Sequence, residues 1–127
     1  MRFGVVGLGS MGKRRVRDLL ALGHAVTGFD IRPDRRYESE TKFGVTTHDS
    51  FEYMARDNLD ACVISTPPDQ HVIYYEQCYA HKLPFFSEAN IFVPRTEWFT
   101  ACEAKSGIRG YPSATWQFYP LFEILKK

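Results

Sequence analysis

Residues 2–12, with the sequence RFGVVGLGSMG, decide the fold of this chain. The segment 2–6 is short and mostly apolar, which is typical of a buried strand. Glycines follow it at once, and residues 11–22 then repeat apolar side chains at helical spacing up to Gly23. This part of the sequence therefore predicts a strand, a glycine-rich turn, and a helix that begins inside the turn.

The glycines of this turn, Gly7, Gly9 and Gly12, are spaced as G-x-G-x-x-G. The first permits a tight turn out of the strand, the second leaves the backbone open to a ligand, and the third lets the helix pack closely. The N–H groups and the positive dipole end of the following helix attract an anion. We therefore predict a pyrophosphate-binding loop that also includes Leu8, Ser10 and Met11.

Strands and helices alternate along the rest of the chain. Alternation with short connections indicates parallel pairing and right-handed crossovers. We predict one doubly wound parallel sheet of the Rossmann type, with strand order 3-2-1-4-5-6 in a three-layer α/β/α domain that spans residues 1–127. The further strands expected are 25–29, 45–46, 59–65, 83–87 and 108–114; the further helices are 50–56, 69–80, one from Pro94 to Gly107, and 119–127; and 31–40 is expected to be a polar segment broken by Pro33.

Asp30 ends the second expected strand, 18 residues after Gly12. A carboxylate at this place accepts hydrogen bonds from the ribose hydroxyls of an adenosine and repels a 2′-phosphate, which favours NAD. Arg32, Arg35 and Arg36 follow directly and are able to reach a 2′-phosphate, so NADP stays open. S-adenosylmethionine is a weaker alternative, because methyltransferase turns usually lack the third glycine.

The composition excludes several classes of partner. The net charge is +1, from 16 basic and 15 acidic residues, which gives no overall attraction to nucleic acid or to an anionic membrane. The apolar runs are too short to span a bilayer. Cys62, Cys78 and Cys102 match no zinc or disulfide spacing, so we expect no metal site and three reduced thiols in a cytoplasmic protein.

Five segments together resemble the N-terminal domain of the glucose–fructose oxidoreductase / inositol dehydrogenase (Gfo/Idh/MocA) family. They are VVGLGSMG at 5–12, FDIRPDR at 29–35, VISTPPDQH at 63–71, FSEAN at 86–90 and WQFYP at 116–120. The third is similar to the family's T-P-x-x-x-H stretch, and the fourth falls where the family has E-K-P. The resemblance covers nearly the whole chain and implies an NAD(P)-dependent oxidoreductase acting on a sugar-like or cyclitol-like substrate.

The resemblance also implies roles for individual residues. Ser65, Thr66 and Pro67 would border the nicotinamide half of the cofactor, and Glu88 would bind near the nicotinamide ribose. His71 would begin a helix beside that loop, where a capping or packing role is favoured over catalysis. A solvated acid at the end of a strand is the alternative for Glu88. The remaining residues expected to border the cofactor are Ile31 and Arg32, next to Asp30.

Two departures from the family limit what the resemblance implies. The lysine of E-K-P, which assists proton transfer, is Ala89 here, and alanine has no titratable group. The family's large C-terminal substrate domain is absent from these 127 residues, so we expect a domain that is catalytically incomplete alone. A non-catalytic module that senses dinucleotides or regulates a partner is the alternative. The aromatic segment 116–122 favours either self-association as a homodimer or packing back on the sheet.

Overall fold

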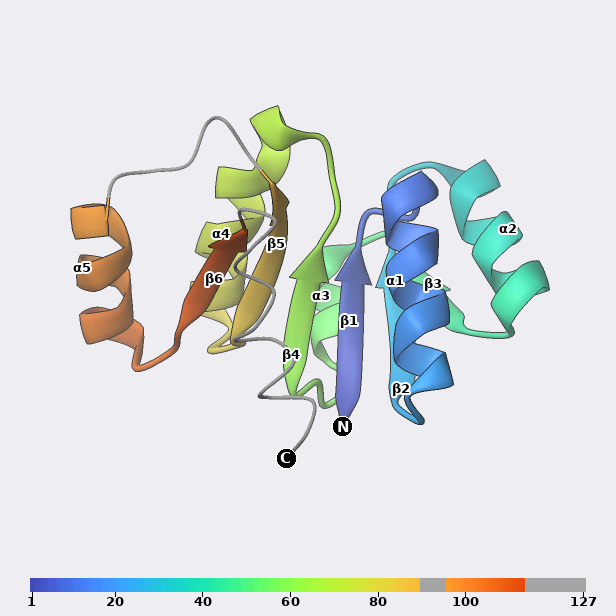
Figure 1. Ribbon diagram of the computed structural model, residues 1–127, viewed down its shortest axis with the longest axis horizontal. Coiled ribbons are helices and arrows are strands. Elements are labelled where there is room, and N and C mark those ends of the chain that lie inside the picture. Colours follow the sequence, from blue (N-terminus) through green and yellow to red (C-terminus); the bar gives the residue numbers. More distant parts are fainter. Residues whose placement is uncertain (90–95, 114–127) are drawn as a thin grey trace.

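The computed structural model describes residues 1–89 and 96–113, which contain a six-stranded parallel sheet (Figure 1). The strand order is β3-β2-β1-β4-β5-β6. This confirms the predicted topology, a Rossmann-like α/β fold. The strands are β1 (Arg2–Val6), β2 (Ala25–Phe29), β3 (Thr46–His48), β4 (Ala61–Ile64), β5 (Phe85–Ala89) and β6 (Gly110–Ser113).

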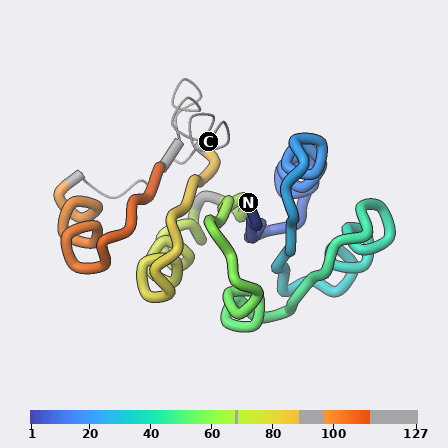
Figure 2. The backbone as a smooth tube through the Cα atoms, turned by 90° about the horizontal axis from the view of Figure 1, so that it is seen from below, coloured from blue at the N-terminus to red at the C-terminus, as the bar shows by residue number. Residues whose placement is uncertain are grey.

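Helices lie on both sides of the sheet, which makes three layers. Figure 2 shows α1 on one side and α3 and α4 on the other. Among the described residues, no helix combines the length and the apolar character needed to cross a membrane. The helices are α1 (Ser10–Ala21), α2 (Pro33–Phe43), α3 (Phe51–Ala55), the 3-10 turn η1 (Pro68–Gln70), α4 (His71–Ala80) and α5 (Thr96–Ser106).

Each side of the sheet has its own apolar core, because successive side chains of a strand point to opposite faces. On the α1 side, Val16 packs with Val5 and Val63. On the other side, Tyr75 of α4 packs with Ile64 of β4. All four residues of β4 are buried, as expected for a strand covered on both faces.

The polar segment expected at 31–40 is instead helical, and this prediction was wrong. Pro33 does not break the segment: it occupies the first turn of α2, where a missing N–H costs nothing. The helix ends at Gly44, which adopts the left-handed conformation with φ of 69°. Ser39 is the one residue of α2 that is buried, so the apolar pattern that normally reveals a helix is missing.

Other boundaries differ by a few residues from those expected. β3 begins at Thr46, β4 is limited to Ala61–Ile64, and the helix expected from Asp69 begins as the 3-10 turn η1. Cys62 and Cys78 are buried free thiols and Cys102 is a half-buried one. The helix expected at 119–127, the helix start at Pro94 and the aromatic segment 116–122 lie outside the described residues.

The strand order reverses between β1 and β4, where the carboxyl ends of the strands leave a crevice. The amide of Gly7 donates to the carbonyl of Phe29 at 2.8 Å, and the amide of Ser65 donates to the carbonyl of Val6 at 2.7 Å. These bonds extend the sheet by one residue past β1 and β4. They bring the glycine turn, Asp30 and the loop after β4 to one edge of the sheet.

Candidate cofactor-binding site

Two of the three turn glycines are required by the fold itself. Gly7 has a φ of +92°, and a Cβ atom there would lie 2.9 Å from the amide nitrogen of Thr66. A Cβ atom at Gly12 would lie 1.7 Å from the carbonyl oxygen of Gly7, which no packing permits. The turn, the start of α1 and the loop after β4 are therefore packed backbone against backbone.

Gly9 differs from them because, among the described residues, the atoms nearest to a Cβ placed there belong to a side chain and not to the backbone. A Cβ atom there would lie 3.6 Å from the guanidinium of Arg35, an ordinary contact distance. Gly9 is the N-cap residue of α1, so it offers no side-chain cap, and the first turn holds no acidic residue. The amide groups of this turn thus meet no negative charge from the helix itself, which suits an incoming anion. Ser10 and Met11, predicted in this loop, are exposed.

Asp30 is held rigidly although its position is near the surface. It is 6% exposed. One carboxylate oxygen accepts a hydrogen bond from the amide of Leu8 at 2.8 Å, and the other accepts from the amide of Arg32 at 2.9 Å. A carboxylate has about four acceptor positions, so two stay available to a ligand. The predicted acid therefore joins the turn to the end of β2 and keeps capacity for two hydroxyl groups.

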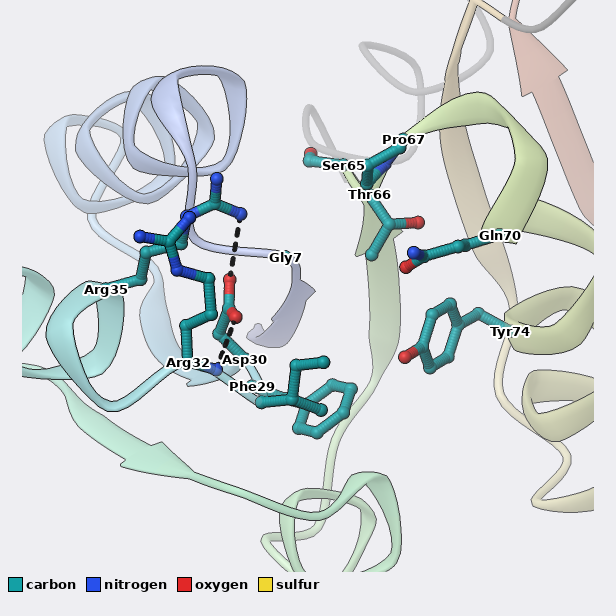
Figure 3. A pocket seen from close by; sticks show the side chains of 11 residues that line it. Gly7, Phe29, Asp30, Arg32, Arg35, Ser65, Thr66, Pro67, Gln70 and Tyr74 are labelled. Carbon is teal, nitrogen blue, oxygen red and sulfur yellow. Dashed lines mark hydrogen bonds and ion pairs between the residues drawn. The ribbon is translucent and has the colours of Figure 1, made fainter.

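A pocket of about 160 Å³ lies between the end of β2 and the loop after β4 (Figure 3). Four of its residues were not among the predicted cofactor-binding set: Phe29, Arg35, Gln70 and Tyr74. Burial raises the pKa of Tyr74 above its ordinary value. Its phenolic hydroxyl can donate a hydrogen bond. The full lining is Gly7, Phe29, Asp30, Ile31, Arg32, Arg35, Ser65, Thr66, Pro67, Gln70 and Tyr74.

The sequence did not predict Gln70 and Tyr74 as pocket residues, because the apolar stripe of α4 indicates only which face of the helix is buried. The two residues are four positions apart, which places them on one side of a helical turn. Figure 3 shows both side chains pointing into the pocket, Gln70 from η1 and Tyr74 from α4. A polar residue and an aromatic residue at this spacing beside the T-P segment are the signal that was available.

The three arginines after Asp30 have different surroundings. The guanidinium of Arg35 lies 3.7 Å from the carboxylate of Asp30, at the mouth of the pocket. Arg36 donates to the backbone carbonyl of Asp30 at 2.8 Å. Arg32 pairs with Asp34 at 2.7 Å, and this hydrogen bond raises the pKa of its guanidinium. Arg35 is therefore the arginine whose charge faces both Gly9 and Asp30.

The loop residues Ser65, Thr66 and Pro67 line the pocket, whereas His71 does not. His71 is fully buried at the first residue of α4, and its Nε2 atom donates to the carbonyl of Thr66 at 2.7 Å. Burial lowers the pKa of His71, which keeps the ring neutral at pH 7. The structure thus gives His71 the packing surroundings that the sequence favoured over a catalytic role.

Glu88 is neither a solvated acid nor a lining residue of the pocket. Its carboxylate accepts two hydrogen bonds from Arg15 of α1, at 2.5 and 3.1 Å, and both side chains are less than one-fifth exposed. Ser65 also donates to it, at 3.4 Å. The hydrogen bonding of Arg15 to Glu88 raises the pKa of the Arg15 guanidinium. The pair joins α1 to the carboxyl end of β5 beside the loop after β4.

A glycine turn with an open second position, an acid fixed at the end of β2 and a pocket between them define a dinucleotide-binding α/β domain. The family described as an oxidoreductase family with an NAD-binding Rossmann fold (GFO_IDH_MocA) matches residues 1–105. The chain therefore belongs to the Gfo/Idh/MocA oxidoreductase family. This membership does not support the S-adenosylmethionine alternative. No curated protein matches the chain.

Many solved structures share the fold. A probable dehydrogenase from Thermotoga maritima is 23% identical with a TM-score of 0.81, over 99% of this chain and 40% of that one. The apo scyllo-inositol dehydrogenase from Lactobacillus casei is 19% identical with a TM-score of 0.79, over 99% and 40%. The WlbA dehydrogenase from Bordetella pertussis, in complex with NADH and UDP-GlcNAcA, is 23% identical with a TM-score of 0.75, over 88% and 36%. The chain therefore spans about two-fifths of these structures or less.

Proposed function

We propose that residues 1–127 act as the dinucleotide-binding domain of an oxidoreductase that transfers hydride between NAD and a sugar-like or cyclitol-like substrate. The observation that carries the proposal is the space beside Gly9. The fold would accept a side chain there, while the neighbouring Gly7 and Gly12 would not. A glycine without a role in packing is explained by a ligand that approaches the backbone at this point.

The residues of the chain fit the cofactor part by part. The amides of the first turn of α1 bind the pyrophosphate, and Asp30 accepts hydrogen bonds from the adenosine ribose. Gln70 and Tyr74 border the adenine side of the pocket, and Ser65–Pro67 form the wall that leads toward the nicotinamide. The bound nicotinamide supplies the hydride chemistry, and the protein orients it.

The same contacts favour NAD while leaving room for NADP. Asp30 repels a 2′-phosphate, because its carboxylate is fixed by two amides and does not turn away. Arg35 offsets part of that repulsion, since its guanidinium lies 3.7 Å from the carboxylate. We therefore expect tighter binding of NADH than of NADPH, with measurable binding of both.

The substrate class rests on the relatives and not on the pocket. One structural neighbour is a scyllo-inositol dehydrogenase, and another was crystallised with a nucleotide sugar. Ala89 provides no acid–base group at the end of β5, so proton transfer needs a residue at another position. In the proposed division, the described residues hold and orient the cofactor, and the remainder of the enzyme binds the substrate.

The test is a thermal and calorimetric titration of the chain with NADH, with NADPH and with S-adenosylmethionine as a negative control. At a hundredfold excess of free ligand over its Kd, a true ligand adds about 2.7 kcal/mol to the free energy of unfolding. We expect this stabilisation with NADH and none with S-adenosylmethionine. A chain that neither nicotinamide cofactor stabilises would refute the proposed function.

A further inference from the structure

A line of buried polar groups runs from the pocket wall to β5. It begins at the carbonyl of Thr66, which accepts from Nε2 of His71 at 2.7 Å. The hydroxyl of Tyr75, one turn later in α4, lies 3.4 Å from Nδ1 of His71 and 2.7 Å from the hydroxyl of Ser87. The side chains of His71, Tyr75 and Ser87 are all fully buried.

The chemistry of the groups sets the direction of each hydrogen bond. A carbonyl oxygen only accepts, so the proton of the neutral His71 ring sits on Nε2. The other ring nitrogen, Nδ1, is then an acceptor, and the Tyr75 hydroxyl donates to it. The Tyr75 oxygen in turn accepts from Ser87. Each of these contacts has one donor and one acceptor, as buried polar networks require.

One end of this line lies at the pocket and the glycine turn, and the other lies next to Glu88. Thr66 lines the pocket, and its amide nitrogen is the atom nearest to a Cβ placed at Gly7, so its backbone abuts the glycine turn. Ser87 directly precedes Glu88 in β5. The ring of Tyr75 stacks on Phe85 with centroids 4.9 Å apart and an interplanar angle of 14°, which fixes the hydroxyl between its two partners.

We propose that His71 is a positioning residue that acts through the Thr66 carbonyl to hold the wall formed by Ser65–Pro67 in the arrangement that receives the cofactor. Tyr75 and Ser87 support it by fixing the orientation of the ring. The inference rests on the proposed function, since it concerns the same pocket. It assigns His71 no contact with the cofactor and no part in the reaction.

The helix α4 supplies a matched control. Tyr79 is four residues after Tyr75 and is also buried, but its hydroxyl meets no hydrogen-bond partner among the described residues. Tyr75→Phe therefore removes the hydroxyl that joins His71 to Ser87, whereas Tyr79→Phe removes a hydroxyl that bonds to none of the described residues. Both substitutions keep the aromatic ring.

The experiment measures the Kd of NADH by calorimetry for the wild-type chain, His71→Leu, His71→Gln, Tyr75→Phe and Tyr79→Phe. Each titration is made at a temperature where circular dichroism shows the variant folded, so a loss of stability alone leaves Kd unchanged. We expect His71→Leu and Tyr75→Phe to raise the Kd of NADH about fivefold. Losing one ordinary hydrogen bond lowers the population of the loop conformation that binds the cofactor by about this factor. The Kd of NADH for Tyr79→Phe should stay within about twofold of the wild-type value, a change smaller than that factor.

His71→Gln tests the proposed contact directly, because the glutamine amide is as many bonds from the backbone as Nε2 of histidine. It should restore most of the affinity that His71→Leu loses. Equal losses in the two variants, or wild-type affinity in both His71→Leu and Tyr75→Phe, would overturn the inference. If His71→Leu does not fold, Tyr75→Phe and Ser87→Ala decide the matter in the same way. A wild-type chain that binds neither NADH nor NADPH overturns the proposed function, and this inference with it.

Discussion

Replacing Gly9 by alanine should separate cofactor binding from folding. The new methyl group would lie 3.6 Å from the Arg35 guanidinium, so the packed chain has room for it. Gly9 has a φ of −74° and a ψ of −160°, which an alanine adopts without strain. In the proposed complex, however, the same space receives the pyrophosphate. The substitution is therefore expected to leave the fold intact and to obstruct the ligand.

The two effects differ in size. Alanine is a poorer N-cap residue than glycine, at a cost of about 0.5–1 kcal/mol, while the lower entropy of the unfolded chain contributes about 0.4–1 kcal/mol in its favour. These terms offset each other, so the free energy of unfolding should change by less than about 0.5 kcal/mol. Losing one charge-assisted hydrogen bond to the pyrophosphate costs about 1.5–3 kcal/mol. We therefore expect the Kd of NADH to rise about 10- to 150-fold.

Two other glycines provide the controls. In Gly12→Ala the methyl group would lie 1.7 Å from the Gly7 carbonyl oxygen, so α1 must move away from the turn. Overpacking of this kind costs about 3 kcal/mol or more, and we expect this variant to lose stability and binding together. Gly23 has a φ of +86°, and a Cβ atom placed there would meet no atom of the described residues within 4 Å apart from its chain neighbours. Gly23→Ala should cost about 1–2 kcal/mol through backbone strain without affecting the Kd.

Urea denaturation and calorimetric titration with NADH, applied to all three variants, make the comparison. If Gly9→Ala binds NADH as tightly as the wild-type chain, the pyrophosphate does not approach that backbone and the proposed site is wrong. A free energy of unfolding of Gly9→Ala several kcal/mol below that of the wild-type chain would also contradict the packing described at this position.

The other predictions concern the charged groups around the pocket. Asp30→Ala should weaken NADH more than NADPH, and Arg35→Ala should do the reverse; parallel calorimetric titrations give the two ratios, and unchanged ratios would mean that neither side chain faces the 2′ position. Glu88→Gln should destabilise the fold by roughly 1 kcal/mol, a value reduced for the partial exposure of its ion pair with Arg15, and a free energy of unfolding equal to that of the wild-type chain would contradict a stabilising pair. Burial lowers the pKa of His71 below its ordinary value of 6.5, so the unfolded chain binds more protons below that pH, and stability should fall as the pH drops from 6.5 toward the lowered pKa. Urea titrations at a series of pH values should show that the free energy of unfolding falls less with decreasing pH in His71→Gln than in the wild-type chain. An equal pH dependence in both would refute the attribution to His71.

The fold was predictable because local patterns and global topology agree along most of the chain. Four of the strands are mostly apolar segments, and segments with apolar residues at helical spacing lie between them. The glycine turn marks the place where the strand order reverses. The exception is α2, which buries a single serine and so carries no apolar stripe. Pro33 suggested a break, although at the first turn of a helix proline favours the start.

The site was predictable where it depends on backbone geometry and less so where it depends on side-chain partners. The spacing from Gly12 to Asp30 places the acid beside the turn, because both elements end at one edge of the sheet. In contrast, Glu88 and Arg15 are 73 positions apart, and no pattern in the sequence links them. Gln70 and Tyr74 were also missed: their four-residue spacing was an available signal, but their place in the pocket becomes clear when η1 and α4 are placed near the end of β2.

In the proposed complex, the amides at the start of α1 receive the pyrophosphate of NADH. The most direct test of this contact is a titration of the isotope-labelled chain with NADH, followed by the chemical shifts of its backbone amides. The largest changes are expected at residues 8–12 and near Asp30, whereas Arg2 at the amino end of β1 and Asp60 just before β4 should be unaffected. Saturable binding with the amides of residues 8–12 unmoved would contradict this contact.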